Sequence, residues 1–329
     1  MKSLLNFNQI KFRILILLVL RSTELFPQTV NSVEAIGITV RDMNEALEFY
    51  TQVLPFEKVS DVFVYGREYE QLKGTFGIHY RKARLRLGNE FLELTDYLTS
   101  GGRSIPEDSK SNDLWFQHIA IVVSDMDSAY SILRKYNVAH VSTAPQTLPK
   151  TIPAAEGIKA FYFRDPDGHN LELIYFPAGK GNPKWQQKYS ALFMGIDHTA
   201  IGVSLTVQSK RFYGDLLGVK YQGESYNFGE EQEHLTNVEG AKLRISGNKA
   251  TEGPGVEFLE YLEPKNGRLY PKDERADDLI HWETLVITSD AMGLYEKLKL
   301  NGARFVSETI ISLPSNVILK RGFAESRTT

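Results

Sequence analysis

One pattern recurs four times along this chain of 329 residues and constrains its fold more than any other feature. Each copy begins with an alternating apolar stretch, which predicts a strand, and continues into residues with apolar spacings of three and four, which predict a helix. The predicted first strands are residues 35–40, 118–123, 198–203 and 283–288. Short alternating stretches follow each helix, so the repeating unit is predicted to be βαβββ.

The last predicted strand of the unit carries a glutamate at a matching place in the first three copies. These glutamates are Glu93, Glu172 and Glu260, on predicted strands 90–94, 170–174 and 257–261. In copy two, residues 164–169 (RDPDGH) precede the strand, and their Pro and Gly supply the backbone angles of a tight hairpin. We interpret His169 as a residue of that turn.

The segments between copies also repeat, and they indicate the history of the chain. Residues 101–114 resemble residues 266–279, which predicts that an ancestor of two units was duplicated. The different segment between copies two and three is rich in Gly and Pro, so the domain boundary is placed there. The predicted organisation is a leader in 1–30, a first pair of modules in 31–179 (31–100 and 113–179), a linker in 180–194, and a second pair in 195–329 (195–265 and 278–329).

Copy four is predicted to lack its final strand. Residues 321–323 align with residues 159–161 of copy two, which leaves only residues 324–329 for the rest of the unit. A sheet without its last strand has an unpaired edge, so we expect a frayed or externally covered C-terminus.

Taken together, these motifs resemble the vicinal oxygen chelate superfamily, which includes glyoxalase I, extradiol dioxygenases and bleomycin-resistance proteins. The resemblance covers residues 31 to the end. It rests on the H-x-A-I-x-V strand starts, the Phe-Tyr pair in the helices, and the RDPDGHNLEL run at residues 164–173. It implies an α+β fold in which four βαβββ modules pair into curved mixed sheets, with the last module truncated.

The resemblance further implies a divalent metal held by the first residue of the first strand and by the glutamate of the last strand. Carried over to this sequence, the ligands are His118 and Glu172 from copy two and His198 and Glu260 from copy three. Copy one offers only Ala35 with Glu93, and a methyl group cannot bind a metal.

Two pairings of the modules are possible, and they predict different sites. If sequence neighbours pair, both cups contain a defect. If copies two and three pair, one cup holds two histidines and two glutamates, while copies one and four form a cup with Ala35, Glu283 and a missing strand. We favour this crossed pairing because it places every intact ligand in one site.

Two imidazoles and two carboxylates form a nitrogen and oxygen donor set suited to one Ni, Zn, Fe, Mn or Co ion. By analogy with glyoxalases, the metal implies a lyase or isomerase that acts through a metal-stabilised enediolate, with Glu172 or Glu260 as the catalytic base. The alternatives are an extradiol-type ring-cleaving dioxygenase and a non-catalytic protein of the drug-resistance type that sequesters a small molecule.

Composition excludes other classes of function. The chain has no Cys, which excludes disulfides and thiolate chemistry, and its net charge of −3 with dispersed Lys and Arg gives no basic stripe for nucleic acid. The expected partner is a small-molecule substrate, and the chain is expected to be a monomer or homodimer.

The first thirty residues follow the plan of a signal peptide. Basic residues precede the apolar run at residues 14–20, and polar residues follow it. We therefore expect an exported or periplasmic protein, with a disordered leader on a cytoplasmic protein as the alternative. The apolar run is too short to span a membrane.

Two polar patterns receive structural interpretations. Residues 230–234 (EEQEH) lack a histidine at each end of a helical turn, so we interpret them as a solvated loop bordering the pocket. Arg84 and Arg244 alternate with apolar residues and are expected to point away from the core.

Overall fold

The computed structural model describes residues 30–187 and 191–313. Residues 1–29, which make up nearly all of the predicted leader, lie outside this range, as do residues 321–329, on which the predicted end of module four depends. Within the described ranges, no helix combines the length and the apolar character needed to cross a membrane.

Each of the first three modules begins with a strand and a helix and continues into further strands. Module one comprises β1 (Ser32–Val40), α2 (Met43–Glu48), the π-helical turn η1 (Phe49–Val53), β2 (Glu57–Tyr65), α3 (Arg67–Lys73), β3 (His79–Leu87) and β4 (Glu90–Tyr97). Module two comprises β5 (Gln117–Val123), α4 (Met126–Lys135), β6 (Ala139–His140), β7 (Gln146–Thr147), β8 (Lys159–Arg164) and β9 (Asn170–Tyr175).

The second half of the chain follows the same order. A 3-10 turn, η2 (Pro183–Gln186), precedes module three, which comprises β10 (Phe193–Gly202), α5 (Thr206–Lys210), the π-helical turn η3 (Arg211–Leu216), β11 (Lys220–Asn227), α6 (Glu230–Thr236), β12 (Lys242–Lys249) and β13 (Gly255–Glu263). Among the described residues, module four contributes β14 (Trp282–Ile287) and α7 (Ala291–Leu300).

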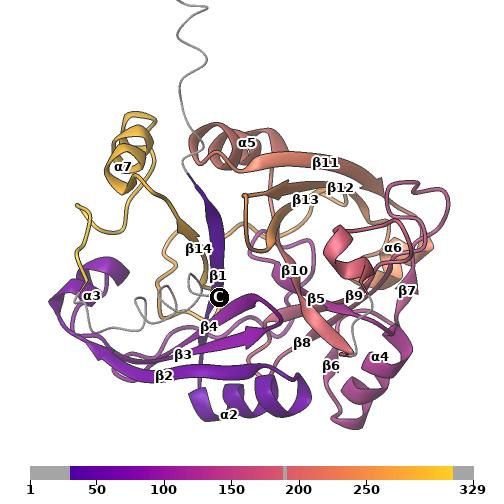
Figure 1. The fold of residues 1–329 in the computed structure, drawn as a ribbon, viewed down its shortest axis with the longest axis horizontal. Helices are drawn as coiled ribbons and strands as arrows, with labels where there is room; N and C mark the ends of the chain where they lie inside the picture. The colour runs from indigo at the N-terminus through magenta and orange to yellow at the C-terminus, as the bar shows by residue number, and fades with distance from the viewer. Residues whose placement is uncertain (1–29, 188–190, 314–329) are drawn as a thin grey trace, which may run out of the picture.

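The modules pair in the crossed arrangement. One sheet has the order β11-β12-β13-β10-β5-β9-β8-β6 and joins modules three and two through the antiparallel pair of β10 and β5. The other has the order β14-β1-β4-β3-β2 and joins modules four and one through the antiparallel pair of β1 and β14 (Figure 1). The prediction that copies two and three share one cup is confirmed.

Local sequence explains where the helices of modules one and two begin. The carboxylate of Asp42 accepts hydrogen bonds from the backbone N–H groups of Asn44 and Glu45, and that of Asp125 accepts one from Ser128 N. Such caps satisfy N–H groups that have no partner inside a helix. The helices α2 and α4 then bury Met43, Ala46, Met126, Ala129 and Leu133 in the main core.

The alternation of β5 separates the core from the opposite face of the sheet. Ile119, Ile121 and Val123 are buried in the main core, whereas His118 lines a cavity on the other face. Successive side chains of a strand point to opposite faces. A strand anchored by its isoleucines therefore presents His118 to the cavity.

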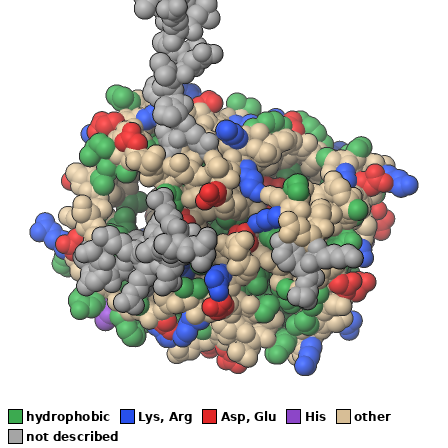
Figure 2. Space-filling view, viewed as in Figure 1, with side chains coloured by type: hydrophobic (Ala, Val, Ile, Leu, Met, Phe, Trp, Pro, Cys, Tyr) green, Lys and Arg blue, Asp and Glu red, His purple; other side chains and the backbone are tan. Residues whose placement is uncertain are grey.

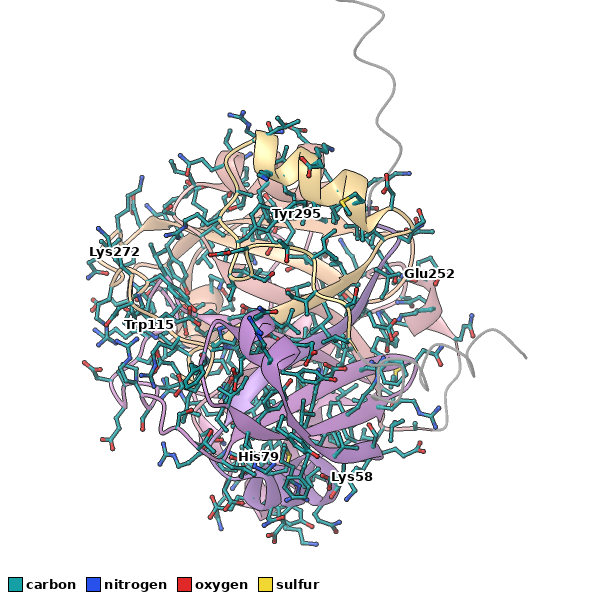
Figure 3. The ribbon with its side chains drawn as sticks, turned by 90° about the vertical axis from the view of Figure 1, so that its left-hand side faces the viewer. Lys58, His79, Trp115, Glu252, Lys272 and Tyr295 are labelled. Atoms are coloured by element: carbon teal, nitrogen blue, oxygen red, sulfur yellow. The ribbon has the colours of Figure 1, made fainter. Side chains whose placement is uncertain are left out.

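Two connectors join the halves of the molecule reciprocally. Arg103 pairs with Asp278 at 2.5 Å, and Arg268 pairs with Asp113 at 2.7 Å. A Cβ atom on Gly102 would lie 1.6 Å from the backbone oxygen of Asp277, so only glycine fits there. In Figure 3, Trp115 and Lys272, which belong to the two connector regions, lie at the same edge of the molecule.

Candidate metal centre

The two predicted histidines lie side by side on the central strand pair. His198 on β10 is opposite Ala120 on β5, and His118 is opposite Ala200, so both side chains occupy the same face of the sheet. Their ring centroids are 5.7 Å apart. The neighbouring strand β9 brings Glu172 beside them.

These three side chains form a compact group of potential ligands. Glu172 Oε2 lies 3.1 Å from His118 Nε2 and 3.6 Å from His198 Nε2. One ligand atom from each residue lies within 4.8 Å of the other two. Two imidazoles and one carboxylate at such distances match the donors that bind borderline divalent metals.

The burial and the protonation state of His118 suit coordination of a metal ion. Its side chain is 1% exposed, and within the described residues neither ring nitrogen has a hydrogen-bond partner of adequate geometry. Burial lowers the pKa of His118 in spite of the opposing effect of Glu172, so the ring is neutral near pH 7. Buried polar atoms are nearly always satisfied, and a neutral imidazole is the form that coordinates a metal. The residues present therefore fit a metal ion.

Glu260, the fourth predicted ligand and alternative base, is not part of this group. Its Oε2 accepts a hydrogen bond of 3.0 Å from Thr206 N at the start of α5. The residue on β13 that corresponds to Glu172 is Glu257, because Glu257 lies opposite Ala200 as Glu172 lies opposite Ala120. Positions three apart on a strand point to opposite faces, so Glu257 lines the cavity and Glu260 points away from it.

Glu257 extends the group toward the cavity. Its Oε2 lies 3.4 Å from His198 Nε2. Burial raises the pKa of Glu257, although His198 opposes this effect. Burial acts to lower the pKa of His198, but Glu257, Asp197 and Glu172 outweigh it and raise that pKa to about 10. A metal ion must therefore displace a proton from His198.

Asp197 is a functional candidate that the sequence did not reveal. A β-bulge between Ile196 and His198 places Asp197 and His198 on the same cavity. Asp197 Oδ2 lies 3.0 Å from His198 Nδ1, and its Oδ1 accepts a hydrogen bond from the indole N–H of Trp185. A carboxylate on the second ring nitrogen fixes the orientation of a metal-binding histidine.

The cavity in front of these residues, of about 440 Å³, is lined by apolar and polar side chains of both modules. Module two supplies apolar residues, including Leu148, Ile158 and Phe176. Module three supplies polar residues, including Asn227 and Gln232. The cavity therefore suits a small molecule with both apolar and hydroxylated surfaces.

Residues 230–234, interpreted above as a solvated loop, instead begin the helix α6. Gln232 is 1% exposed and donates no hydrogen bond from Nε2 within the described chain. The sequence signals for this helix are Gly229 at its N-cap position and the apolar Leu235 within its length.

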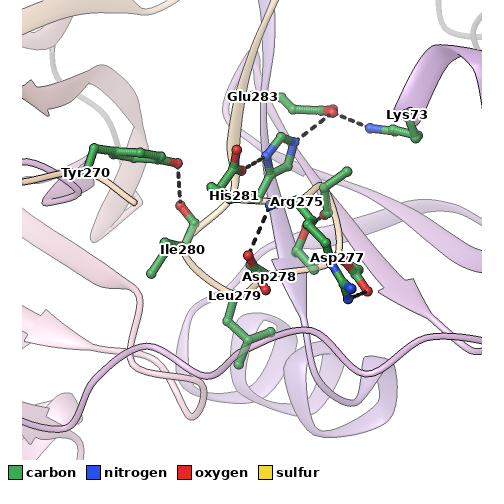
Figure 4. Close-up of polar contacts among 12 residues, drawn as sticks. Lys73, Tyr270, Arg275, Asp277, Asp278, Leu279, Ile280, His281 and Glu283 are labelled. Atoms are coloured by element: carbon green, nitrogen blue, oxygen red, sulfur yellow. Dashed lines mark hydrogen bonds and ion pairs between the residues drawn. The ribbon is translucent and has the colours of Figure 1, made fainter. Parts of the chain in front are cut away.

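Modules one and four form a second cup, whose lining includes the ionisable side chains of Lys73, Lys82, Arg84, Glu93, His281 and Glu283. Ala35 occupies the place of a histidine, and Glu93 lies opposite Gly37, as Glu257 lies opposite Ala200. Ion pairs line this cup. Glu93 binds Lys82 at 2.5 Å and Arg84 at 3.0 Å, while Glu283 binds Lys73 and His281 (Figure 4).

Arg84 differs from the expectation that it points away from the core. Its side chain is 2% exposed and also pairs with Glu34. The alternation of β3 that predicts a polar face is present, but that face is the interior of the second cup. A strand pattern identifies the two faces of a sheet without showing whether solvent covers the polar one.

Comparisons with known proteins agree with this architecture. Residues 32–173 match the model of the Glyoxalase/Bleomycin resistance protein/Dioxygenase superfamily. The 2-epi-5-epi-valiolone epimerase of Actinomyces sp is 32% identical over 154 residues, which cover 45% of this chain and 81% of that protein. Two solved variants of glyoxalase I from Zea mays share the fold, each with a TM-score of 0.51 and 14% identity; the matches cover 82% of this chain and 79% and 80% of theirs.

The chain belongs to the Glyoxalase/Bleomycin resistance protein/Dioxygenase superfamily. The predicted family and the predicted α+β fold of curved mixed sheets are confirmed. Membership and geometry together identify the cup between modules two and three as the candidate metal centre.

Proposed function

We propose that this protein is a metal-dependent isomerase that epimerises a carbon next to the carbonyl group of a small hydroxylated ketone. The observation that carries the proposal is the buried group of His118, Glu172 and His198, in which no hydrogen bond of adequate geometry reaches either ring nitrogen of His118 from the described residues, although Glu172 Oε2 lies 3.1 Å from Nε2. The relative from Actinomyces sp, named as an epimerase, supports an isomerase over the other chemistries of the superfamily.

His118, Glu172 and His198 would hold the metal in this proposal. A bound divalent ion supplies Lewis acidity, which polarises the substrate carbonyl and acidifies the neighbouring C–H group. Asp197 orients His198 through Nδ1 and leaves its Nε2 directed at the site. Glu260 does not hold the metal in this proposal; it accepts a hydrogen bond from Thr206 N at the start of α5.

Glu257 is the proposed base. It faces the cavity beside His198, and burial raises its pKa, which brings a carboxylate closer to the basicity that proton transfer near neutral pH requires. Glu172 comes from the opposite module. An epimerase must also return a proton to the other face of the carbon, and Glu172, besides holding the metal, is the proposed donor of that proton.

The lining of the cavity supports the substrate class. Gln232 Nε2, which has no hydrogen-bond partner within the described chain, suits a hydroxyl group, while Leu148, Ile158 and Phe176 suit a carbon skeleton. The name of the Actinomyces relative also points to a small hydroxylated ketone.

The proposal is tested by metal content and by exchange of a carbon-bound hydrogen. We expect the purified chain to retain about one equivalent of a transition metal. In D2O, the protein should exchange the hydrogen on the hydroxyl-bearing carbon of 2-hydroxycyclohexanone for deuterium, and NMR measures this exchange. Glu257→Gln should abolish exchange with metal retained, and Glu260→Gln is the matched control that should preserve both. Metal-free protein that binds the ketone without exchange would instead identify a sequestering protein.

An extradiol-type dioxygenase is the second candidate, and one observation favours it. Two histidines and one carboxylate, without Glu260, form the donor set typical of non-haem iron oxygenases. Oxygen consumption by the Fe²⁺-loaded protein with catechol, together with no exchange of the ketone hydrogen, would establish this alternative and reject the isomerase.

A further inference from the structure

The second cup is a cavity of about 520 Å³ with a donor-rich interior, although it lacks the histidines of a metal site. It corresponds to the candidate metal centre by strand register. Arg84 lies opposite Glu93. In the cup between modules two and three, here called the metal cup, the corresponding residues are Gly247 opposite Glu257 and Tyr162 opposite Glu172. The cationic side chain of Arg84 therefore stands at a position that faces the interior of the second cup.

Lys82 repeats this replacement on the same strand. It lies two positions before Arg84 and therefore shares its face of β3. The corresponding residues of the metal cup are apolar, Ile245 on β12 and Ala160 on β8. The positive charge of this cup thus comes from its own side chains.

Hydrogen-bond donors in the second cup exceed the acceptors that hold them. An ammonium group carries three N–H donors. Among the described residues, Lys73 pairs with Glu283 and Lys82 with Glu93, so N–H groups remain on both lysines. Glu34 and Glu274, which do not line the cavity, hold Arg84 and His281. The two carboxylates that do line it are occupied by these cations.

Tyr69 supplies a further donor, and this one has no partner. The residue lines the cavity and is 5% exposed, and its hydroxyl group makes no hydrogen bond within the described chain. It lies three residues after the capping Gly66 of α3, as Gln232 lies three residues after Gly229 of α6. Both cups therefore present a buried polar group from the same place in the fold.

We propose that the second cup binds a small molecule that carries a carboxylate on an apolar body. The lysine N–H groups and the Tyr69 hydroxyl group receive the carboxylate, because charge-assisted hydrogen bonds are the strongest available there. Val64, Leu72 and Leu285 line the same cavity and cover the apolar body. This site is independent of the proposed metal chemistry.

The test measures binding of 4-fluorobenzoate to the full chain by broadening of its fluorine NMR signal. We expect saturable binding that weakens about tenfold in Tyr69→Phe and in Lys82→Met, each of which loses a hydrogen bond to a charged group. In Lys82→Met, Glu93 still has its ion pair with Arg84. Tyr162→Phe, which removes a hydroxyl group from the metal cup, is the matched control and should leave the affinity unchanged.

Any of the following binding results would overturn the proposal: no saturable binding, equal binding of the neutral 4-fluorobenzamide, or the same affinity in Tyr69→Phe as in the unmodified chain. Inorganic phosphate serves as a further probe. If it competes as strongly as 4-fluorobenzoate itself, the apolar residues contribute nothing and the proposed ligand class is wrong. Retained circular dichroism in the tyrosine variant excludes misfolding as the cause of weaker binding.

Discussion

Replacing Asp197 by Asn tests whether this carboxylate positions a metal ligand. Asp197 Oδ2 lies 3.0 Å from His198 Nδ1, and its side chain is 19% exposed. A hydrogen bond to a charged group contributes about 1.5–3 kcal/mol, and the partial exposure of Asp197 favours the lower half of that range. Since about 1.4 kcal/mol corresponds to a tenfold change, we expect metal affinity to fall ten- to thirtyfold, roughly.

The assay is competition for Zn²⁺ against a chromophoric chelator over a series of pH values, and the affinities are compared after correction for protonation of His198, because Asp197 also raises the pKa of that ring. Asp165→Asn is the matched control, because Asp165 forms a similar 2.9 Å contact with His169 Nδ1 outside the metal centre. The control should destabilise the fold while its metal affinity stays within about twofold of the original. An unchanged affinity in Asp197→Asn, or an equal loss in both variants, would refute a positioning role for Asp197.

Three further predictions concern the rest of the fold. Glu274 and Glu283 overcome the effect of burial and raise the pKa of His281 to about 9, so the ring contributes stability below pH 6.5 that is lost as the pH rises through 9. Urea unfolding should show about 3 kcal/mol of this loss, and His281→Gln should remove it; parallel pH profiles would contradict the ion-pair network. Gly102→Ala should cost more than about 2 kcal/mol because its Cβ would overlap Asp277, whereas Gly101→Ala, with no atom within 4 Å, should unfold at nearly the original urea concentration. Chelation of the metal should lower the melting temperature by calorimetry, because the ion binds only the folded chain, and an unchanged value would argue against a bound ion.

The repeat predicted the architecture because it records strands and helices directly. The positions of His118 and His198 at the start of two strands predicted their proximity once modules two and three were paired. This pairing followed from the placement of the defects, Ala35 among them, and the antiparallel contact of β5 with β10 confirms it.

The remaining features depend on register, which local motifs do not determine. The run E-F-L-E occurs at residues 90–93 and 257–260, yet the structural counterpart of Glu93 is Glu257. Matching the letters therefore gave Glu260, three residues away and on the other face of the strand. Asp197 escaped notice for a related reason, because only a bulge brings it to the same face as His198.

Charge patterning also requires the tertiary context. In Figure 2, acidic and basic side chains are interspersed over the visible face. The alternation of Arg84 with apolar residues is the same pattern that a solvent-exposed strand shows. Burial of Arg84 among Glu34 of β1 and Phe91 and Glu93 of β4 distinguishes it from an exposed arginine, and these partners lie on strands other than its own.

The crossed arrangement makes the proposed metal binding a joint property of two halves of the polypeptide. His118 and Glu172 precede the linker, whereas His198 follows it. If the chain were cleaved within that linker, each fragment would keep one imidazole donor, and uptake of the ion would require the fragments to meet. Its rate would then depend on the product of their concentrations, whereas in the continuous chain the two donors are always delivered together.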